Sequence, residues 1–316
     1  MFLENTIVPK HKFWNYLLGS LIIIFAAFVG QIPLAIVAIG NSFSAGKGIP
    51  TDEKQLMNLL DKNLSLFLIL ISFAFALFAI YLVAKYLHKQ RFLTLTTART
   101  KVDWKRIVFS FSLWGIFTIS STLLMFYTSP DNFVINFKWH SFIILFFISI
   151  ILIPIQTSTE EYVFRGYLMQ GFASLARNKW FPLIMTSIIF GGMHVMNPEV
   201  RELGYIVMFY YVGTGLFLGI ITLMDDGMEL ALGFHAANNL FSALLVTSEW
   251  SALQTDAIFK DISKPSAGIE VLVPLVVVFP LLLFIFSKKY KWNNWKEKLT
   301  GAIKIPTNTL KTNNHG

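Results

Sequence analysis

The chain has 316 residues, 55% of them hydrophobic and only 14% charged, a composition too apolar for an ordinary soluble domain and typical of a polytopic helical membrane protein. Its apolar segments are continuous runs without strict alternation, which argues against a transmembrane β-barrel, and the absence of cysteine excludes a thiol nucleophile, disulfides and Cys-ligated metal sites. The net charge of +8 lies in loops and flanks, as the positive-inside rule expects, so it does not indicate nucleic-acid binding.

A membrane span needs about 20 mostly apolar residues, and eight stretches of this chain approach that length. The first follows a short basic lead and is too long for the apolar part of a signal peptide, so we expect it to be a retained anchor. The predicted fold class is therefore all-α, a polytopic transmembrane bundle of about eight helices. In chain order the segments are 16–39, 64–84, 107–127, 141–155 continuing to 176, 181–195, 204–224, 231–247 and 271–286.

Lys and Arg are distributed unequally between the two sets of loops. In the terminal flanks and the loops 89–106 and 177–179 there are 17, against seven in the alternate loops. By the positive-inside rule, this excess places both termini in the cytoplasm. We expect residues 1–300 to form one integral, multi-pass domain of the cell membrane, with a motif core at 141–248, followed by a flexible cytoplasmic tail at 301–316.

Two carboxylates and a guanidinium interrupt the apolar segment 141–176. Charges inside a membrane are costly, so they are usually paired, turned inward and functional. Glu161 and Arg165 stand four residues apart with the acid first, the favourable order for an ion pair on one helix face, so Glu161 is the expected partner of Arg165. Glu160 points about 100° away from Glu161. Glu160 is therefore left without a local cation and is available as a base.

Two of the six histidines, His194 and His235, fall within apolar segments. His194 follows Phe190 by one helical turn and Asn239 follows His235 by one turn, so each pair shares a helix face. Ionisable residues inside a membrane are more often functional than structural. Asn238 is expected to pair with backbone and has no predicted catalytic role. The candidate catalytic residues are Glu160, His194, His235 and Asn239.

Three motifs thus lie in order on successive membrane segments: Glu-Glu-x-x-x-Arg at 160–165, Phe-x-x-x-His at 190–194 and His-x-x-x-Asn at 235–239. Together they resemble the motifs of the CPBP intramembrane protease family, which includes the type II CAAX prenyl endopeptidases and the bacterial proteins often described as ABI or bacteriocin-immunity proteases. The resemblance covers about residues 141–248, and the chain does not depart from the pattern at the motif positions. It implies a metal-independent glutamic protease that needs no cofactor.

The resemblance also implies a role for each motif residue. Glu160 and His194 would hold and activate a water, His235 and Asn239 would stabilise the oxyanion, and Glu161 and Arg165 would support the site. Peptide hydrolysis without a Ser or Cys nucleophile needs a base that takes a proton from water, and a carboxylate beside a histidine in a low-dielectric cavity meets that need. Hydrogen-bond donors one turn apart can both face the oxygen of the tetrahedral intermediate.

Three other functions would use the same residues differently. Glu160, His194 and His235 could form a two-histidine, one-carboxylate zinc site with Glu161 as base, although the chain has no His-Glu-x-x-His helix. A second alternative is a non-catalytic membrane regulator or self-immunity protein that keeps the polar cluster for packing. A third is an ion or proton carrier, which intramembrane acids would suit but for which no inverted repeat is visible.

The expected partners are the lipid bilayer and a peptide or protein substrate, with lipidated and membrane-embedded substrates both open, and no nucleic acid. His194 falls near the outer end of its segment and His235 in the inner half of its own, so the two meet only if the helices are offset. We therefore expect segment 141–176 to break near Pro154 and to set Glu160 partway into the bilayer. The resulting polar intramembrane cavity is expected to open toward the cytoplasm.

Overall fold

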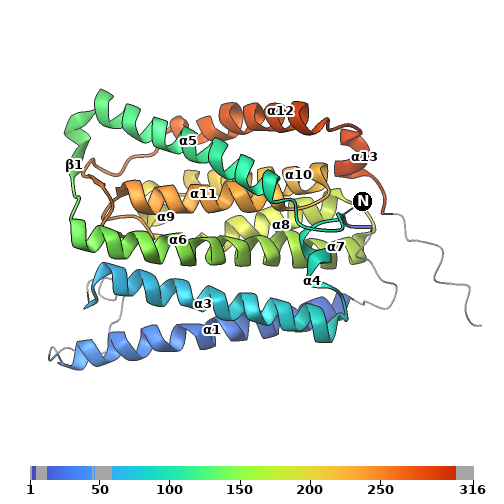
Figure 1. The fold of residues 1–316 in the computed structure, drawn as a ribbon, viewed down its shortest axis with the longest axis horizontal. Helices are drawn as coiled ribbons and strands as arrows, with labels where there is room; N and C mark the ends of the chain where they lie inside the picture. The colour runs from blue at the N-terminus through green and yellow to red at the C-terminus, as the bar shows by residue number, and fades with distance from the viewer. Residues whose placement is uncertain (1, 5–12, 45, 47–58, 304–316) are drawn as a thin grey trace, which may run out of the picture.

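The helices of the protein run side by side in one elongated bundle, which the computed structural model describes for residues 2–4, 13–44, 46 and 59–303 (Figure 1). The beginning and the end of the described chain lie at the same end of this bundle. The flexible tail predicted at 301–316 falls outside the described residues from 304 onward.

All eight apolar segments predicted from the sequence are helical. Helices are expected of such segments, because backbone N–H and C=O groups within lipid must find their partners inside the same segment. The elements are α1 (Phe13–Ser44), α3 (Lys62–Leu82), η1 (Val83–Leu87), α4 (Phe92–Thr96), α5 (Trp104–Thr128), η2 (Pro130–Asn132), β1 (Phe133–Ile135), α6 (Trp139–Glu161), η3 (Tyr162–Leu168), α7 (Met169–Ala176), α8 (Trp180–Gly192), α9 (Pro198–Leu203), α10 (Ile206–Asp225), α11 (Glu229–Leu245), β2 (Val246–Thr247), β3 (Phe259–Asp261), η4 (Ile269–Leu272), η5 (Pro274–Val278), α12 (Phe279–Tyr290) and α13 (Trp295–Thr300).

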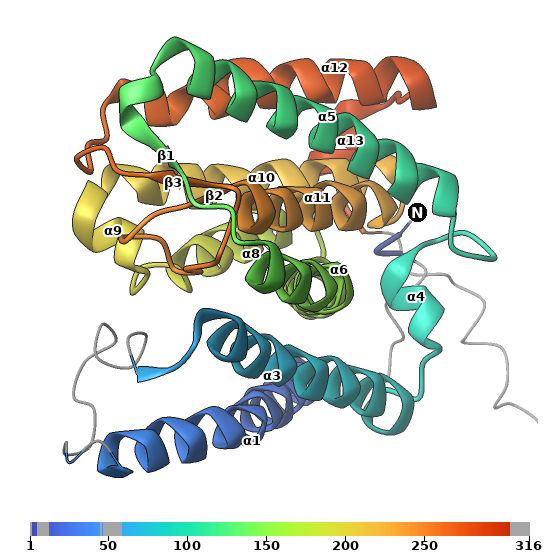
Figure 2. The ribbon, with the colours of Figure 1, turned by 60° about the vertical axis from the view of Figure 1, so that its left-hand side comes forward.

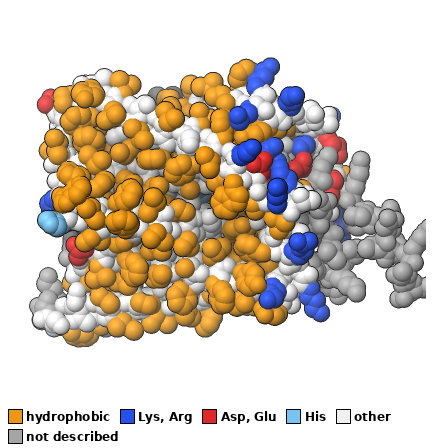
Figure 3. Space-filling model, in the orientation of Figure 1, with side chains coloured by type: hydrophobic (Ala, Val, Ile, Leu, Met, Phe, Trp, Pro, Cys, Tyr) orange, Lys and Arg blue, Asp and Glu red, His pale blue; other side chains and the backbone are white. Residues whose placement is uncertain are grey.

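Five helical stretches of the described chain are long and apolar enough to cross a membrane. Three further predicted spans are shorter: α8 has 13 residues, α11 has 17 and α12 has 12. Figure 3 shows hydrophobic side chains over most of one face of the bundle and Lys and Arg gathered at one end. Such a continuous apolar surface is what a protein surrounded by lipid presents. The prediction of an all-α polytopic membrane bundle is confirmed.

The bundle has two parts that meet at α6. On one side, α1 packs against α3, and α3 also contacts α6 (Figure 2). On the other side, α11 packs against α5 and α6, and α10 packs against α8. Separate clusters of buried apolar residues fill the two parts, one around Tyr16 and Ile80 and the other around Trp114 and Phe234. α6 therefore contacts both parts of the bundle, through α3 on one side and α11 on the other.

The segment built around α6 does not break at Pro154, and that expectation from the sequence is wrong. The helix runs through Pro154, and a π-helical turn, η3, joins it to α7 without interruption. A proline is tolerated within a membrane helix because neighbouring side chains and small local adjustments can satisfy the backbone groups that it leaves unpaired. The irregularity instead follows directly after Glu160 and Glu161, and π-helical turns occur frequently at functional sites.

The two ends of the bundle are built differently. One end, here called the sheet end, carries three short strands in the order β1-β3-β2. The other, here called the basic end, carries the beginning and the end of the described chain and a network of ion pairs. There Arg99 contacts Asp225 and Glu229 at 3.1 Å each, Arg106 also contacts Asp225, and Trp292 donates a 3.1 Å hydrogen bond to the same carboxylate. Side chains from three separate segments thus close the basic end.

Candidate active site

Glu160 and Glu161 end α6 and face in different directions, as helical geometry predicts. Glu161 is fully buried and accepts a 3.0 Å hydrogen bond from Arg165, so the expected ion pair on one helix face is present. The side chain of Glu160 is 16% exposed and lines a cavity. One glutamate is therefore held in the interior, and the other is accessible from the cavity.

The buried Glu161 carboxylate is shared between Arg165 and His235. Nδ1 of His235 lies 2.7 Å from the same Glu161 oxygen that Arg165 contacts. Since a carboxylate paired with a guanidinium accepts, Nδ1 of His235 carries a hydrogen. The other ring nitrogen, Nε2, lies 3.6 Å from a Glu160 oxygen. His235 thus stands between the two glutamates, behind the cavity wall and only 5% exposed.

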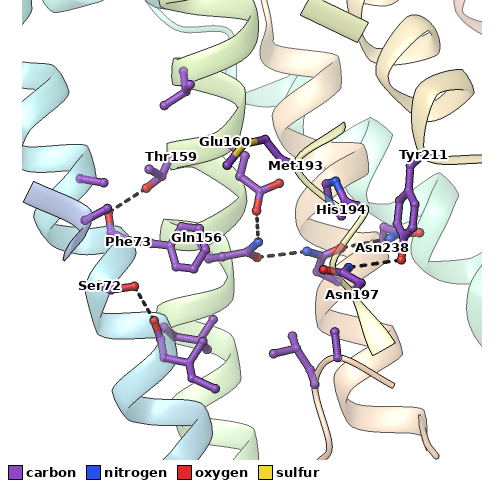
Figure 4. Close-up of a pocket in the computed structure, with 18 of the residues that line it drawn as sticks. Ser72, Phe73, Gln156, Thr159, Glu160, Met193, His194, Asn197, Tyr211 and Asn238 are labelled. Atoms are coloured by element: carbon purple, nitrogen blue, oxygen red, sulfur yellow. Dashed lines mark hydrogen bonds between the residues drawn. The ribbon is translucent and has the colours of Figure 1, made fainter. Parts of the chain in front are cut away.

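Glu160 has a further neighbour that the sequence motifs do not include. Gln156 donates a short hydrogen bond to Glu160, and its side-chain oxygen accepts from Nδ2 of Asn239 at 3.0 Å (Figure 4). Gln156 precedes Glu160 by four residues, and this spacing could have revealed the contact. Asn238 also departs from expectation, because it donates to the side chain of Asn239 at 3.0 Å and not to backbone.

His194 lies in the turn after α8, although the sequence placed it on a helix extending to residue 195. α8 ends at Gly192, where two glycines in succession weaken the helix. Nδ1 of His194 then donates to the Phe190 carbonyl at 2.7 Å and satisfies one of the carbonyls that a helix end leaves unpaired. A carbonyl only accepts, so Nδ1 carries the hydrogen, and Nε2 is the nitrogen that can take a proton. The ring stacks on Tyr211 with 4.4 Å between centroids.

The two histidines meet at the ring of Phe190. Its centroid lies 4.8 Å from that of His194 and 6.0 Å from that of His235. Figure 4 shows Glu160 and His194 facing each other across the cavity. Because α8 ends early, His194 lies close enough to Phe190 and His235 to share the site. The two histidines therefore meet through a short α8 and not through a break at Pro154.

The cavity between these side chains has a volume of about 720 Å³, within the range of sites that hold ligands of substantial size. Apolar residues of α1 and α3, such as Ile23 and Phe73, form one wall. The opposite wall is polar. It includes Gln156, Glu160, His194, Asn238 and Asn239.

The cavity extends toward the sheet end of the bundle. Its wall includes Glu199 of α9 and residues 251–253, which follow β2, and none of the residues in the ion-pair network of the basic end. The cavity therefore extends away from the basic end, which the side chains of Arg99, Asp225 and Glu229 occupy. Since the described chain begins and ends at the basic end, the predicted cytoplasmic termini and the predicted cytoplasmic opening of the cavity do not hold together.

Comparison with known proteins identifies relatives of this chain. The sequence model of the family described as type II CAAX prenyl endopeptidase Rce1-like matches residues 139–241. The chain is also 30% identical over 241 residues to the uncharacterized protein YyaK of Bacillus subtilis (strain 168), an alignment that covers 76% of this chain and 80% of YyaK. This chain belongs to the Rce1-like family. No solved structure matches it significantly.

The Rce1-like match begins at the first residue of α6 and ends within α11, so it contains all three motifs and Gln156. Membership places the chain, at the level of the family, among membrane proteases of the CAAX type. The helices α1 and α3, which complete the cavity, lie outside the matched segment.

The candidate zinc ligands in this Rce1-like chain are Glu160, His194 and His235. His235 donates through Nδ1 to Glu161 and His194 donates through Nδ1 to backbone, so Nε2 is the nitrogen of each ring that a metal would bind. Within the described ranges, no three His, Asp or Glu side chains are grouped so that they could hold a metal ion. The grouping of these residues therefore gives the zinc alternative no support.

Proposed function

We propose that this protein is an intramembrane endopeptidase that hydrolyses a peptide bond with a water activated by Glu160 and His194. The observation that carries the proposal is a half-buried carboxylate facing a histidine across a cavity inside an apolar bundle. Within the described part of the chain, Glu160 makes no salt bridge with Lys or Arg, which leaves its charge available for proton transfer. His194 presents its Nε2 to the same space.

The chemistry needs a base, an acid and a binding site for developing negative charge. Glu160 takes a proton from water and later returns it to the leaving amine, as a positioned carboxylate can do in a site of low dielectric constant. His194 holds the water through Nε2. Positioned general acid–base groups of this kind contribute about 10²- to 10⁴-fold to a reaction rate.

Asn239 and His235 supply donors for the oxyanion of the tetrahedral intermediate. Asn239 lines the cavity, and its amide nitrogen carries a second hydrogen beyond the one given to Gln156. His235 stands beside Glu160, with Nε2 3.6 Å from that carboxylate and Nδ1 2.7 Å from Glu161. Glu161 and Arg165 hold this histidine in place.

The substrate is a peptide or protein segment that enters the cavity, with lipidated and membrane-embedded segments both compatible with its apolar wall. No metal or other cofactor takes part. The excess of Lys and Arg in the terminal flanks and in the loops 89–106 and 177–179 supports an orientation with both termini in the cytoplasm. The cavity then extends toward the opposite leaflet, and the substrate reaches Glu160 from the bilayer or from that side.

The test is cleavage of a fluorogenic peptide library by the purified full-length protein in detergent, with Glu160→Gln measured alongside. Glu160→Gln keeps the shape of the side chain and should lower kcat about 10²- to 10⁴-fold. Glu202→Gln is the matched control, since Glu202 lies on α9, pairs only with the exposed Arg201 at 3.4 Å, and does not line the cavity. A strong chelator is added in a parallel arm.

Cleavage that is lost in Glu160→Gln and kept with chelator establishes the glutamic protease. Cleavage lost with chelator would replace the proposal by a metal-dependent one. If folded wild-type protein and Glu160→Gln cleave the library equally, or neither cleaves it, the protease proposal fails and a non-catalytic regulator becomes the better account.

A further inference from the structure

A chain of side-chain hydrogen bonds runs from the apolar core of the bundle to Glu160. Trp114 on α5 donates through its indole N–H to Asn238 at 3.1 Å, and Asn238 donates to Asn239 at 3.0 Å. Asn239 donates to Gln156 at 3.0 Å, and Gln156 donates the short hydrogen bond to Glu160. Three helices, α5, α11 and α6, contribute to this relay.

The indole of Trp114 fixes the direction of every bond in the relay. An indole N–H only donates, so the atom of Asn238 that it meets must be the amide oxygen. The NH₂ group of Asn238 then faces Asn239, whose oxygen must accept, and the same reasoning passes through Gln156 to Glu160. The relay therefore presents an N–H group to Glu160, whichever way the separate amides would otherwise turn.

Both ends of the relay are secured by their surroundings. Trp114 is 6% exposed and packs with its ring centroid 4.4 Å from that of Phe234 in the apolar core. Gln156 is 7% exposed. Polar side chains buried to this degree are costly to leave unpaired, so the relay has a single well-satisfied arrangement.

We infer that Gln156, Asn238 and Trp114 are positioning residues for Glu160, and that their aligned amides hold the carboxylate in one orientation. This inference rests on the proposed function of Glu160 as the base. The relay acts through the direction of its hydrogen bonds, because neutral amides do not pass protons along. A hydrogen bond in a medium of low dielectric constant is stronger than one in water, so the Gln156 donor fixes the orientation of the carboxylate.

The relay acts together with the other charged and titratable groups around Glu160. α11 contributes His235, the turn after α8 contributes His194, and the residues of α1 and α3 that line the cavity include no titratable side chain. The remaining ionisable groups near this site are Glu161, Arg165, Glu199, Tyr210 and Tyr211. Of the described residues around Glu160, Gln156 is the one that donates a hydrogen bond directly to its carboxylate.

The experiment compares Gln156→Met, an unbranched apolar replacement of similar length, with Thr157→Val in the full-length protein. Thr157 is the next residue of the same helix, is fully buried, and donates only to carbonyls of its own helix, so Thr157→Val is a matched control. Trp114→Phe is a second variant that retains an aromatic ring in the core and removes the donor that sets the direction of the relay.

Two properties are measured on each variant. The first is kcat and KM on a peptide that the wild type cleaves. The second requires no turnover: it is the frequency of the infrared carboxylate stretch of Glu160, which depends on the hydrogen bonds that the carboxylate accepts and is assigned by its disappearance in Glu160→Gln. Melting temperature in detergent confirms that each variant is folded.

Gln156→Met should lower kcat about tenfold or more, change KM by less than about twofold, and shift the carboxylate band of Glu160 from its wild-type frequency. Trp114→Phe should lower kcat about threefold and change the Glu160 band in the same direction. Its effect is smaller because the hydrogen bond that it loses joins two neutral groups. Thr157→Val should match the wild type in both measurements.

The inference is overturned if folded Gln156→Met matches the wild type, or if it loses kcat without a shift of the Glu160 band, because the loss would then have another cause. If no sample cleaves any peptide but the band shifts in Gln156→Met and not in Thr157→Val, the proposed protease function fails while the relay stands.

Discussion

Asp225 and Glu160 are carboxylates in the interior of the same bundle with opposite surroundings. The side chain of Asp225 is 1% exposed and is bonded by Arg99, Arg106 and an indole N–H. Glu160 is 16% exposed, accepts from one amide and has a histidine at 3.6 Å. A carboxylate whose acceptor positions are filled by cations serves to join segments, whereas one with a free position next to a cavity can bind water.

The largest expected effect concerns a third carboxylate, Glu161, which resembles Asp225 in being buried and paired with an arginine. Arg165→Met removes its cation and leaves a buried charge beside His235. Breaking a buried ion pair in this way should lower the free energy of unfolding by about 3–5 kcal/mol, measured by chemical or thermal unfolding in detergent.

Arg201→Met provides the control for this change, because the Arg201 side chain is 63% exposed and its pair with Glu202 should contribute about 0–1 kcal/mol. Equal unfolding free energies for Arg165→Met and the wild type would show that Glu161 is not held by its ion pair, and the likeness to Asp225 would be lost.

The next largest effect is expected at Asn239, on the accessible side of the comparison. Asn239→Ala removes a donor for the oxyanion and should lower kcat about 10²- to 10³-fold, measured with the peptide cleaved by the wild type. Asn136→Ala is the matched control, since Asn136 donates to the Ala257 carbonyl at 3.1 Å near the sheet and does not line the cavity. A kcat for Asn239→Ala equal to that of Asn136→Ala would remove Asn239 from the mechanism.

The smallest of the three effects is expected at Asp225. Asp225→Asn keeps the shape of the side chain but weakens charge-assisted hydrogen bonds, so the free energy of unfolding should fall by about 1.5–3 kcal/mol. The kcat of the folded variant should stay within about twofold of the wild type. A large fall in kcat at unchanged stability would mean that the basic end takes part in catalysis, and would abolish the distinction between Asp225 and Glu160.

Much of the architecture follows from local sequence. Continuous apolar runs must become helices in lipid, and all eight predicted segments did so. The pairing of Glu161 with Arg165, and the freedom of Glu160 from it, follow from the angle between neighbours on one helix. These predictions depend on residues within five positions of each other, where geometry is set by the helix itself.

The remaining features depend on contacts between distant segments. The cavity extends away from the basic end because Arg99 meets Glu229, 130 positions along the chain. The relay exists because Trp114 meets Asn238 on another helix, and no spacing rule joins them. The early end of α8 and the continuity of α6 through Pro154 reflect how each helix end is satisfied by its neighbours. Such features require the packed bundle.

The basic end also bears on how the chain is made. Asp226, at the end of α10, accepts hydrogen bonds from the backbone N–H of Phe2 at 3.1 Å and from Lys298 at 2.6 Å. Its partners are thus among the earliest and the latest residues of the described chain to leave the ribosome. The Phe2 contact can form only after α10 has been synthesised, and the Lys298 contact only after α13 has followed, so the basic end is completed by the last helix of the described chain.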